Sequence, residues 1–234
     1  MTATDSTSVP GSGRRPLAVA LVVTPVLWLA AAAVSPALKS DSAAQLTVVA
    51  QHADRWFGYT ALLTLGTILF VPAILGIMRL TRACMPRLTL VGGALLGYGT
   101  IIAVGDVMSQ LTTWQMATGH ADRAQMAALL DRTNNAGGSA LFFAPGGLAF
   151  LVGSILLTIA LVRTRAVPVW VSVTFLLGII AQLVGFSSSS VAVIVASAVL
   201  SLVAMAMLAR RLWAGSDDKQ SAAATGEREF VSAI

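Results

Sequence analysis

Long runs of apolar residues separated by short polar segments dominate the pattern along this chain. Six of the runs contain the roughly 20 residues that a helix needs to cross a hydrocarbon core about 30 Å thick. These runs are residues 17–36, 57–78, 88–110, 139–162, 167–186 and 191–209. Each is continuously apolar and does not alternate between apolar and polar positions, as the strands of a membrane barrel do. The pattern therefore predicts six transmembrane helices.

The two ends of the chain have a different composition. Residues 1–16 are rich in Ser, Thr, Gly and Pro, and residues 210–234 mix small and charged residues without apolar periodicity. Both ends are predicted to be disordered. The domain organisation is then one six-helix transmembrane domain, residues 17–209, between two disordered tails. No segment outside the runs is long enough for a soluble catalytic domain.

Two segments between the runs predict further helices. Residues 42–56 contain few helix-breaking residues and follow Ser40 and Asp41, either of which suits an N-cap. Residues 121–132 place apolar side chains at helical spacing, which predicts a short helix on the outer surface.

Composition agrees with a membrane protein. Of the 234 residues, 56% are hydrophobic and only 11% are charged, whereas about a quarter of a soluble domain is charged. The chain has too few charges to cover a water-facing surface, which excludes a compact soluble enzyme and a disordered protein. The fold class predicted is an all-α, polytopic transmembrane helix bundle.

Basic residues border the apolar runs, so the net charge of +5 indicates the positive-inside bias of membrane loops and no nucleic-acid partner. With the N-terminus in the cytoplasm, eleven basic residues lie inside: Arg14, Arg15, Arg79, Arg82, Arg87, Arg163, Arg165, Arg210, Arg211, Lys219 and Arg228. Four lie outside: Lys39, Arg55, Arg123 and Arg132. We therefore expect a multi-pass protein of the inner (plasma) membrane with both termini cytoplasmic.

Residues 17–36 also admit a second interpretation. Arg14 and Arg15 precede the run and small residues end it, as in a cleaved signal peptide. The run is long for a signal peptide, which favours a retained helix. The excess of Arg over Lys is typical of a GC-rich bacterial genome.

Asp106 is the first candidate for chemistry, because no other acidic residue lies within the six runs. A carboxylate at the centre of a membrane helix costs about 2.5–3.5 kcal/mol, and such groups usually face a bundle interior or a wet cavity. Gly92, Gly99, Ala103 and Gln110 share one helical face with Asp106. Small residues on that face allow close helix packing, so Asp106 is expected to point inward.

Other runs place polar residues at a similar depth: Thr60, Thr64 and Gln182. If these faces converge, they form an outer-facing polar pocket with Asp106 as its charged anchor, Gln110 beside it and Arg55 as the nearest counter-ion. A small solute or ion is the ligand expected there. The alternative is structural, since Thr and Ser in membrane helices commonly bond their own backbone or join helices.

The predicted outer loops repeat one tetrapeptide, His-Ala-Asp-Arg, starting at His52 and at His120. With Asp54 and Asp122, the two histidines have side chains that zinc accepts. A metal site there needs the two loops to meet, and exposed histidines are the default interpretation.

Several motifs are absent. The chain has no P-loop, dinucleotide-binding glycine pattern, H-E-x-x-H or C-x-x-C motif, and its single cysteine, Cys84, excludes an intrachain disulfide. No acid–base or nucleophile–base pair lies within the runs, so the sequence favours a protein that is not an enzyme and predicts no cofactor. The alternative to solute binding or transport is an accessory role, in which small-residue helix faces bind another membrane protein or a second copy.

The layout resembles a broad set of uncharacterised bacterial six-helix integral membrane proteins. The matching features are Asp41-Ser42-Ala43-Ala44 after the first run, Arg55 before the second, and Pro168-Val169-Trp170 at the start of the fifth. The resemblance implies a fold and no residue roles.

Overall fold

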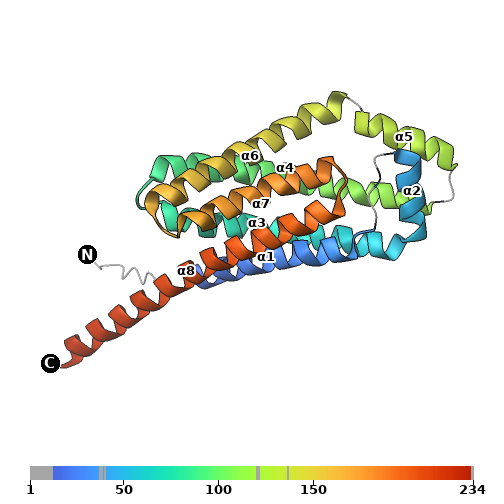
Figure 1. Ribbon diagram of the computed structural model, residues 1–234. Coiled ribbons are helices and arrows are strands. Elements are labelled where there is room, and N and C mark those ends of the chain that lie inside the picture. The colour runs from blue at the N-terminus through green and yellow to red at the C-terminus, as the bar shows by residue number, and fades with distance from the viewer. Residues whose placement is uncertain (1–12, 37–38, 40, 120–121, 136, 233–234) are drawn as a thin grey trace, which may run out of the picture.

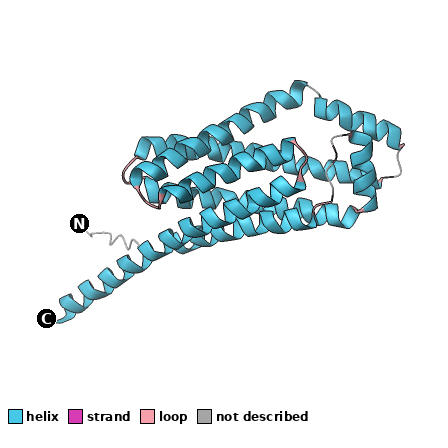
Figure 2. Ribbon diagram, in the orientation of Figure 1, coloured by secondary structure: helices cyan, strands magenta, loops and turns pink. Residues whose placement is uncertain are grey.

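The computed structural model describes the backbone of residues 13–36, 39, 41–119, 122–135 and 137–232. This part of the chain forms eight α-helices and contains no strand (Figures 1 and 2). The prediction of an all-α fold is confirmed.

Six of the helices coincide with the six apolar runs. They are α1 Arg14–Val34, α3 Ala53–Thr81, α4 Pro86–Thr118, α6 Gly137–Thr164, α7 Val169–Ser187 and α8 Val191–Ser232. Each contains a stretch long and apolar enough to cross a membrane, which in α6 is Phe143–Thr164 and in α8 is Val191–Ala214. The six apolar helices are consistent with a multi-pass integral membrane protein.

Helices α4 and α8 extend farthest beyond the predicted runs. Helix α4 continues past residue 110 to Thr118, because Trp114 and Ala117 pack against the shorter helices described below. The backbone of α8 is helical to Ser232, which differs from the disordered tail that composition predicts. The added segment contains Ala222, Ala223 and Ala224, and alanine is the strongest helix former.

Two shorter helices, α2 Ser42–Gln51 and α5 Arg123–Asn135, lie between the runs. Helix α5 confirms the helix predicted at residues 121–132. Helix α2 is shorter than the predicted 42–56, because the backbone leaves helical geometry at His52 and residues 53–56 belong to α3. Asp41 caps α2, since its side chain accepts a hydrogen bond of 2.7 Å from the backbone N–H of Ala44. The other predicted cap, Ser40, lies outside the described residues. Figure 1 shows both short helices at one end of the molecule, and we call this the cap end. Its small apolar core consists of Leu46, Val49, Trp56, Ala117 and Leu130.

The long helices form a closed ring in the order α1, α3, α4, α6, α7, α8 and back to α1. The interface between α6 and α7 is the least extensive in this ring. Helix α3 also contacts α6 and α8 across the ring, so the interior is filled by side chains such as those of Phe70, Ile77 and Phe175. Short connections at the ends make neighbouring helices antiparallel (Figure 1).

Glycines seven residues apart bring α4 and α6 into close contact. A Cβ atom added to Gly99 would lie 2.6 Å from Phe150 Cβ and 2.7 Å from the carbonyl oxygen of Gly146. Gly92 meets the segment around Gly153 in the same way. The absence of side chains lets the two backbones approach, as is common between membrane helices.

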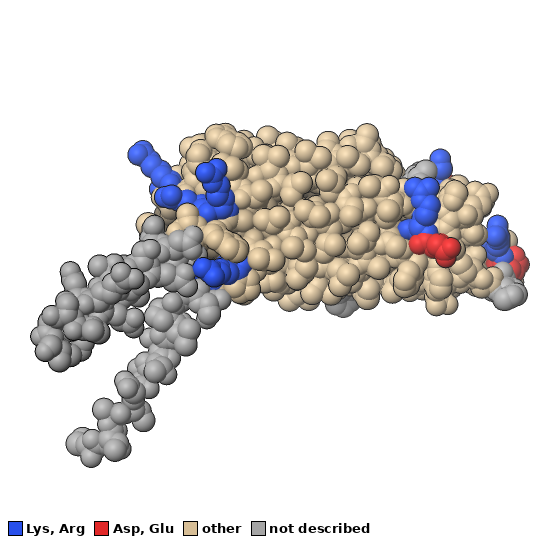
Figure 3. Space-filling model, turned by 90° about the horizontal axis from the view of Figure 1, so that it is seen from below, with Lys and Arg blue, Asp and Glu red and all other residues tan. Residues whose placement is uncertain are grey.

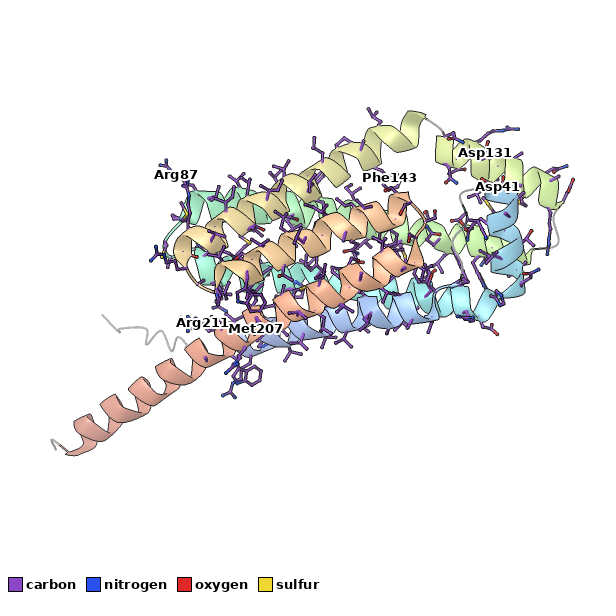
Figure 4. The ribbon with its side chains drawn as sticks, in the orientation of Figure 1. Asp41, Arg87, Asp131, Phe143, Met207 and Arg211 are labelled. Atoms are coloured by element: carbon purple, nitrogen blue, oxygen red, sulfur yellow. The ribbon has the colours of Figure 1, made fainter. Side chains whose placement is uncertain are left out.

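Charge separates along the bundle. Nine arginines lie at the end opposite the cap end, which we call the basic end, and no acidic side chain is described there: Arg14, Arg15, Arg79, Arg82, Arg87, Arg163, Arg165, Arg210 and Arg211. The five acidic side chains that the structure describes lie in the half with the cap end: Asp41, Asp54, Asp106, Asp122 and Asp131. Figure 3 shows an uncharged surface between the two ends on the face in view, and Figure 4 labels Arg87 and Arg211 far from Asp41 and Asp131. Two charged ends around an uncharged belt are the arrangement expected of a membrane-spanning bundle.

Candidate functional site

Asp106 lies on the stripe of α4 that packs against α6, seven residues after Gly99. Its side chain is nevertheless exposed. It follows Arg87 by 19 residues, which at 1.5 Å per residue is about 28 Å along the helix, close to the thickness of a hydrocarbon core. The carboxylate is therefore at the boundary of the apolar belt nearest the cap end.

Asp106 is exposed because α6 does not cover it. Among described side chains in residues 141–148, only Gly146 is buried. Figure 1 shows this part of α6 leaning away from α4 and α7 toward α5. Pro145 lies within α6, and proline within a helix removes a backbone hydrogen bond and favours a bend. The sequence predicts that Asp106 points inward, whereas its side chain is exposed on the face of α4 that carries Gly99.

Tyr59 connects Asp106 with the interior of the bundle. Its side chain on α3 is only 4% exposed and is within electrostatic range of the Asp106 carboxylate. It also lines a small cavity together with Gln182 of α7. Helices α4 and α7 do not contact each other. Tyr59 of α3 lies at the cavity with Gln182, whereas Asp106 does not line that cavity.

Sequence analysis missed Tyr59. The apolar runs contain two tyrosines, and the other, Tyr98, is 48% exposed on α4. The signal available in the sequence was the position of Tyr59 beside Thr60, near the start of its run. Its burial depends on α1, α7 and α8, which come from distant parts of the chain.

The cavity beside Tyr59 is small and mainly apolar, with a few polar groups in its wall. Its volume is about 10 Å³, and α1 contributes Trp28 to its wall while α8 contributes Ser197. The indole Nε1 of Trp28, a donor, and Oε1 of Gln182, an acceptor, are both buried without a hydrogen-bond partner. A water molecule needs about 10–15 Å³ and two to four polar partners. The volume of the cavity is therefore at the lower limit for one water, and the cavity is too small for a larger solute.

The two threonines of α3 have different surroundings. Thr64 Oγ1 donates a 2.7 Å hydrogen bond to the backbone carbonyl of Thr60, which is the structural role left open for it. Thr60 is fully buried, and its own hydroxyl has no partner. One turn toward the cap end, Trp56 Nε1 donates a 3.2 Å bond to the carbonyl oxygen of Gln110, so Gln110 joins α4 to α3 through its backbone.

Arg55 does not join this group. It lies exposed in the first turn of α3, and no ion pair connects it with Asp106. The counter-ion role proposed from depth alone is not realised in the structure.

Of the four residues of the hypothetical metal site, the structure describes three. His52 and Asp54 are exposed at the start of α3. Asp122 accepts a 2.9 Å hydrogen bond from the backbone N–H of Ala124 and so caps α5. His120 lies outside the described residues. In the part of the chain that is described, no group of three or more metal-binding side chains comes together, and the four-residue site stays a hypothesis.

The chain matches no protein-family model, no curated protein and no protein of known structure. The site is therefore interpreted from its own chemistry.

Proposed function

We propose that this integral membrane protein binds a small cationic solute or ion at the outer boundary of the bundle, with Asp106 as its counter-charge. The observation that carries the proposal is the exposed carboxylate of Asp106 at the edge of the apolar belt. Isolated carboxylates at membrane depth typically mark the path of a substrate or ion.

The charge distribution supports a cation as the ligand. Asp106 has no ion-pair partner at Arg55, and four more carboxylates lie farther toward the cap end. Carboxylates in a low-dielectric region attract cations strongly, because the surroundings screen the charge poorly. A small cation would exchange part of its hydration shell for Asp106 and for neutral partners such as Gln110 and Gln182.

Passage deeper into the bundle would require helix movement. The cavity at Tyr59 holds about 10 Å³, so a solute could pass only if helices separate. The interface between α6 and α7 is the least extensive in the ring, and the described residues between 141 and 148 are exposed except Gly146. Movement of this part of α6 is the simplest way to open a path from Asp106 toward Gln182.

The binding proposal is tested by thermal unfolding of the purified protein in detergent, with sodium, magnesium and tetramethylammonium chloride as probes. We expect at least one of these cations to raise the unfolding midpoint in a saturable way. A ligand at a hundredfold excess over its dissociation constant stabilises a protein by about 2.7 kcal/mol. In Asp106→Asn, which changes charge and hardly changes size, this stabilisation should disappear.

Asp54→Asn is the matched control, since it removes the same charge from an exposed aspartate in the first turn of α3. It should retain the full cation effect. Equal losses in both variants would show that only general charge matters, and a wild-type protein that none of the three cations stabilises saturably would contradict the proposal.

Transport is tested with the cation that the first assay identifies. Wild-type protein in liposomes should move it across the bilayer, whereas Asp106→Asn should not, at equal levels of folded protein. Binding without flux in the wild type would limit the function to binding.

The accessory role remains as the second candidate. Gly92, Gly99, Gly178 and Gly185 contact neighbouring helices of the same bundle, so these faces are not free for a partner. Gly97 and Gly105 have open space beside them on α4, next to Ile101, which is 65% exposed. A partner protein that co-purifies with the wild type and is lost in Gly97→Leu would favour the accessory role.

A further inference from the structure

An open hollow lies at the basic end, far from Asp106. It has a volume of about 980 Å³ and is bounded by the turn between α6 and α7 and by one face of α8. Ligand-binding pockets typically have volumes of about 300–1,000 Å³. The hollow is therefore large enough for a molecule of lipid-headgroup size.

Four arginines line this hollow. Arg163 and Arg165 come from the end of α6 and the turn that follows, while Arg210 and Arg211 are consecutive in α8. All four side chains are exposed, and no acidic side chain lines the hollow among the residues that the structure describes. Guanidinium groups bind phosphate through paired hydrogen bonds, so the chemistry selects a phosphate-bearing anion.

The backbone at Arg165 adds to this argument. Its φ angle is 49°, in the left-handed region, and a side chain there costs energy that glycine avoids. The turn is otherwise ordinary, with the N–H of Arg165 donating a 3.3 Å hydrogen bond to the carbonyl of Val162. Arginine is thus present at a position where conformation alone would favour glycine.

The rest of the wall is apolar. Val162, Val167, Val169 and Met207 line the hollow beside the arginines, and Figure 4 shows Met207 next to Arg211 on α8. A free phosphate ion would make no favourable contact with this apolar wall. A phospholipid would use both parts, with its phosphate on the arginines and its acyl chains against the valines and the methionine.

Tryptophans indicate that the hollow lies at headgroup depth. Trp170 adjoins Val169 and is 51% exposed, and Trp213 precedes Ala214 and is 42% exposed. Arg15 lies over the Trp213 ring at 5.7 Å from its centroid. Exposed tryptophans in membrane proteins concentrate at the level of the lipid headgroups.

We infer that this hollow binds the headgroup of an anionic phospholipid, with the phosphate held between the arginine pairs of α6 and α8. Basic pockets between membrane helices are a known form of lipid recognition. The inference rests on the membrane location of the proposed function, and it does not depend on the role of Asp106.

The inference is tested by native mass spectrometry of the full-length, delipidated protein with equal amounts of phosphatidylglycerol and phosphatidylcholine. Wild type should retain phosphatidylglycerol preferentially. Arg210→Gln/Arg211→Gln should lose at least tenfold in apparent affinity for phosphatidylglycerol, because each arginine near anionic lipid contributes a severalfold effect. The second double variant, Arg163→Gln/Arg165→Gln, should show the same loss of affinity. Agreement between the two double variants would show that misfolding of one variant does not cause the loss.

Arg79→Gln/Arg82→Gln is the matched control. It removes two exposed arginines from the same end, and neither lines the hollow. This variant should bind phosphatidylglycerol within about twofold of the wild type. Equal losses in the control and the hollow variants would overturn the inference, since only total charge would then matter.

Three further outcomes separate the sources of phosphate and the two proposals. Stabilisation of the protein by sodium phosphate, with the same arginine dependence and no preference between the lipids, would replace the lipid with a free phosphate. Retention of both lipids without preference would overturn only the proposed headgroup site. Failure to retain any lipid would count against the membrane location, on which both proposals depend.

Discussion

Gly97 and Gly99 lie two residues apart on α4, yet their surroundings are opposite. Gly97 has no heavy atom within 4 Å of an added Cβ, whereas at Gly99 the nearest atoms are the backbone of α6 and Phe150 Cβ at 2.6 Å. We expect Gly99→Ala to force α4 and α6 apart and to lower the free energy of unfolding by about 1–3 kcal/mol. Thermal unfolding in detergent measures the change.

Gly97→Ala is the control for this residue-scale prediction. Alanine in a helix is favoured over glycine by up to about 1 kcal/mol, so the stability of this variant should be unchanged or slightly raised. If both substitutions have the same effect, Gly99 is not a contact point between α4 and α6.

At the scale of single elements, α5 depends on one buried side chain. Leu130 is 8% exposed and packs with Leu46 and Val49 of α2, whereas its neighbour Leu129 is 44% exposed. Truncation of a buried leucine typically costs 2–5 kcal/mol. We expect Leu130→Ala to release α5 and to speed hydrogen exchange of its backbone amides by about tenfold or more.

Leu129→Ala should leave exchange in α5 close to the wild-type rate, because that side chain contributes little to the cap-end core. Exchange in the cap-end part of α3 provides an internal reference. Equal protection of α5 in Leu130→Ala and the wild type would show that other contacts hold this helix.

For the whole molecule, the separation of charge predicts an orientation. Cys84, the only cysteine of the chain, is exposed in the turn between α3 and α4 at the basic end. The positive-inside rule places this end in the cytoplasm. A membrane-impermeant maleimide should therefore label the native protein in inside-out vesicles and not in intact cells.

The reverse result is expected for Cys84→Ser/Ala128→Cys. Ala128 is exposed on α5 at the cap end, so this variant should react in intact cells. Labelling of Cys84 from outside would invert the topology and would place the Asp106 site on the cytoplasmic side.

The amino-acid sequence determined the six long helices by itself. In lipid, an apolar run of about 20 residues satisfies the hydrogen bonds of its own backbone by forming a helix. Each run therefore predicts its own helix independently of the neighbouring segments. The same local logic identified α2 and its cap at Asp41, because an N-cap acts on the backbone within three residues. The predicted and observed bounds of α4 and α8 differ at the helix ends, where apolar content no longer determines where the helix stops.

The tertiary structure alone decided what the helix faces meet. Asp106 and Gly99 lie on one stripe of α4, which sequence spacing shows, but Gly99 packs against the backbone of α6 whereas the Asp106 side chain is exposed. Tyr59 gains its place beside Gln182 from four helices that are distant in sequence. The arginines at the basic end form a hollow only because the α6–α7 turn lies against α8. Helix formation is local, whereas each of these arrangements depends on contacts between segments far apart in the chain.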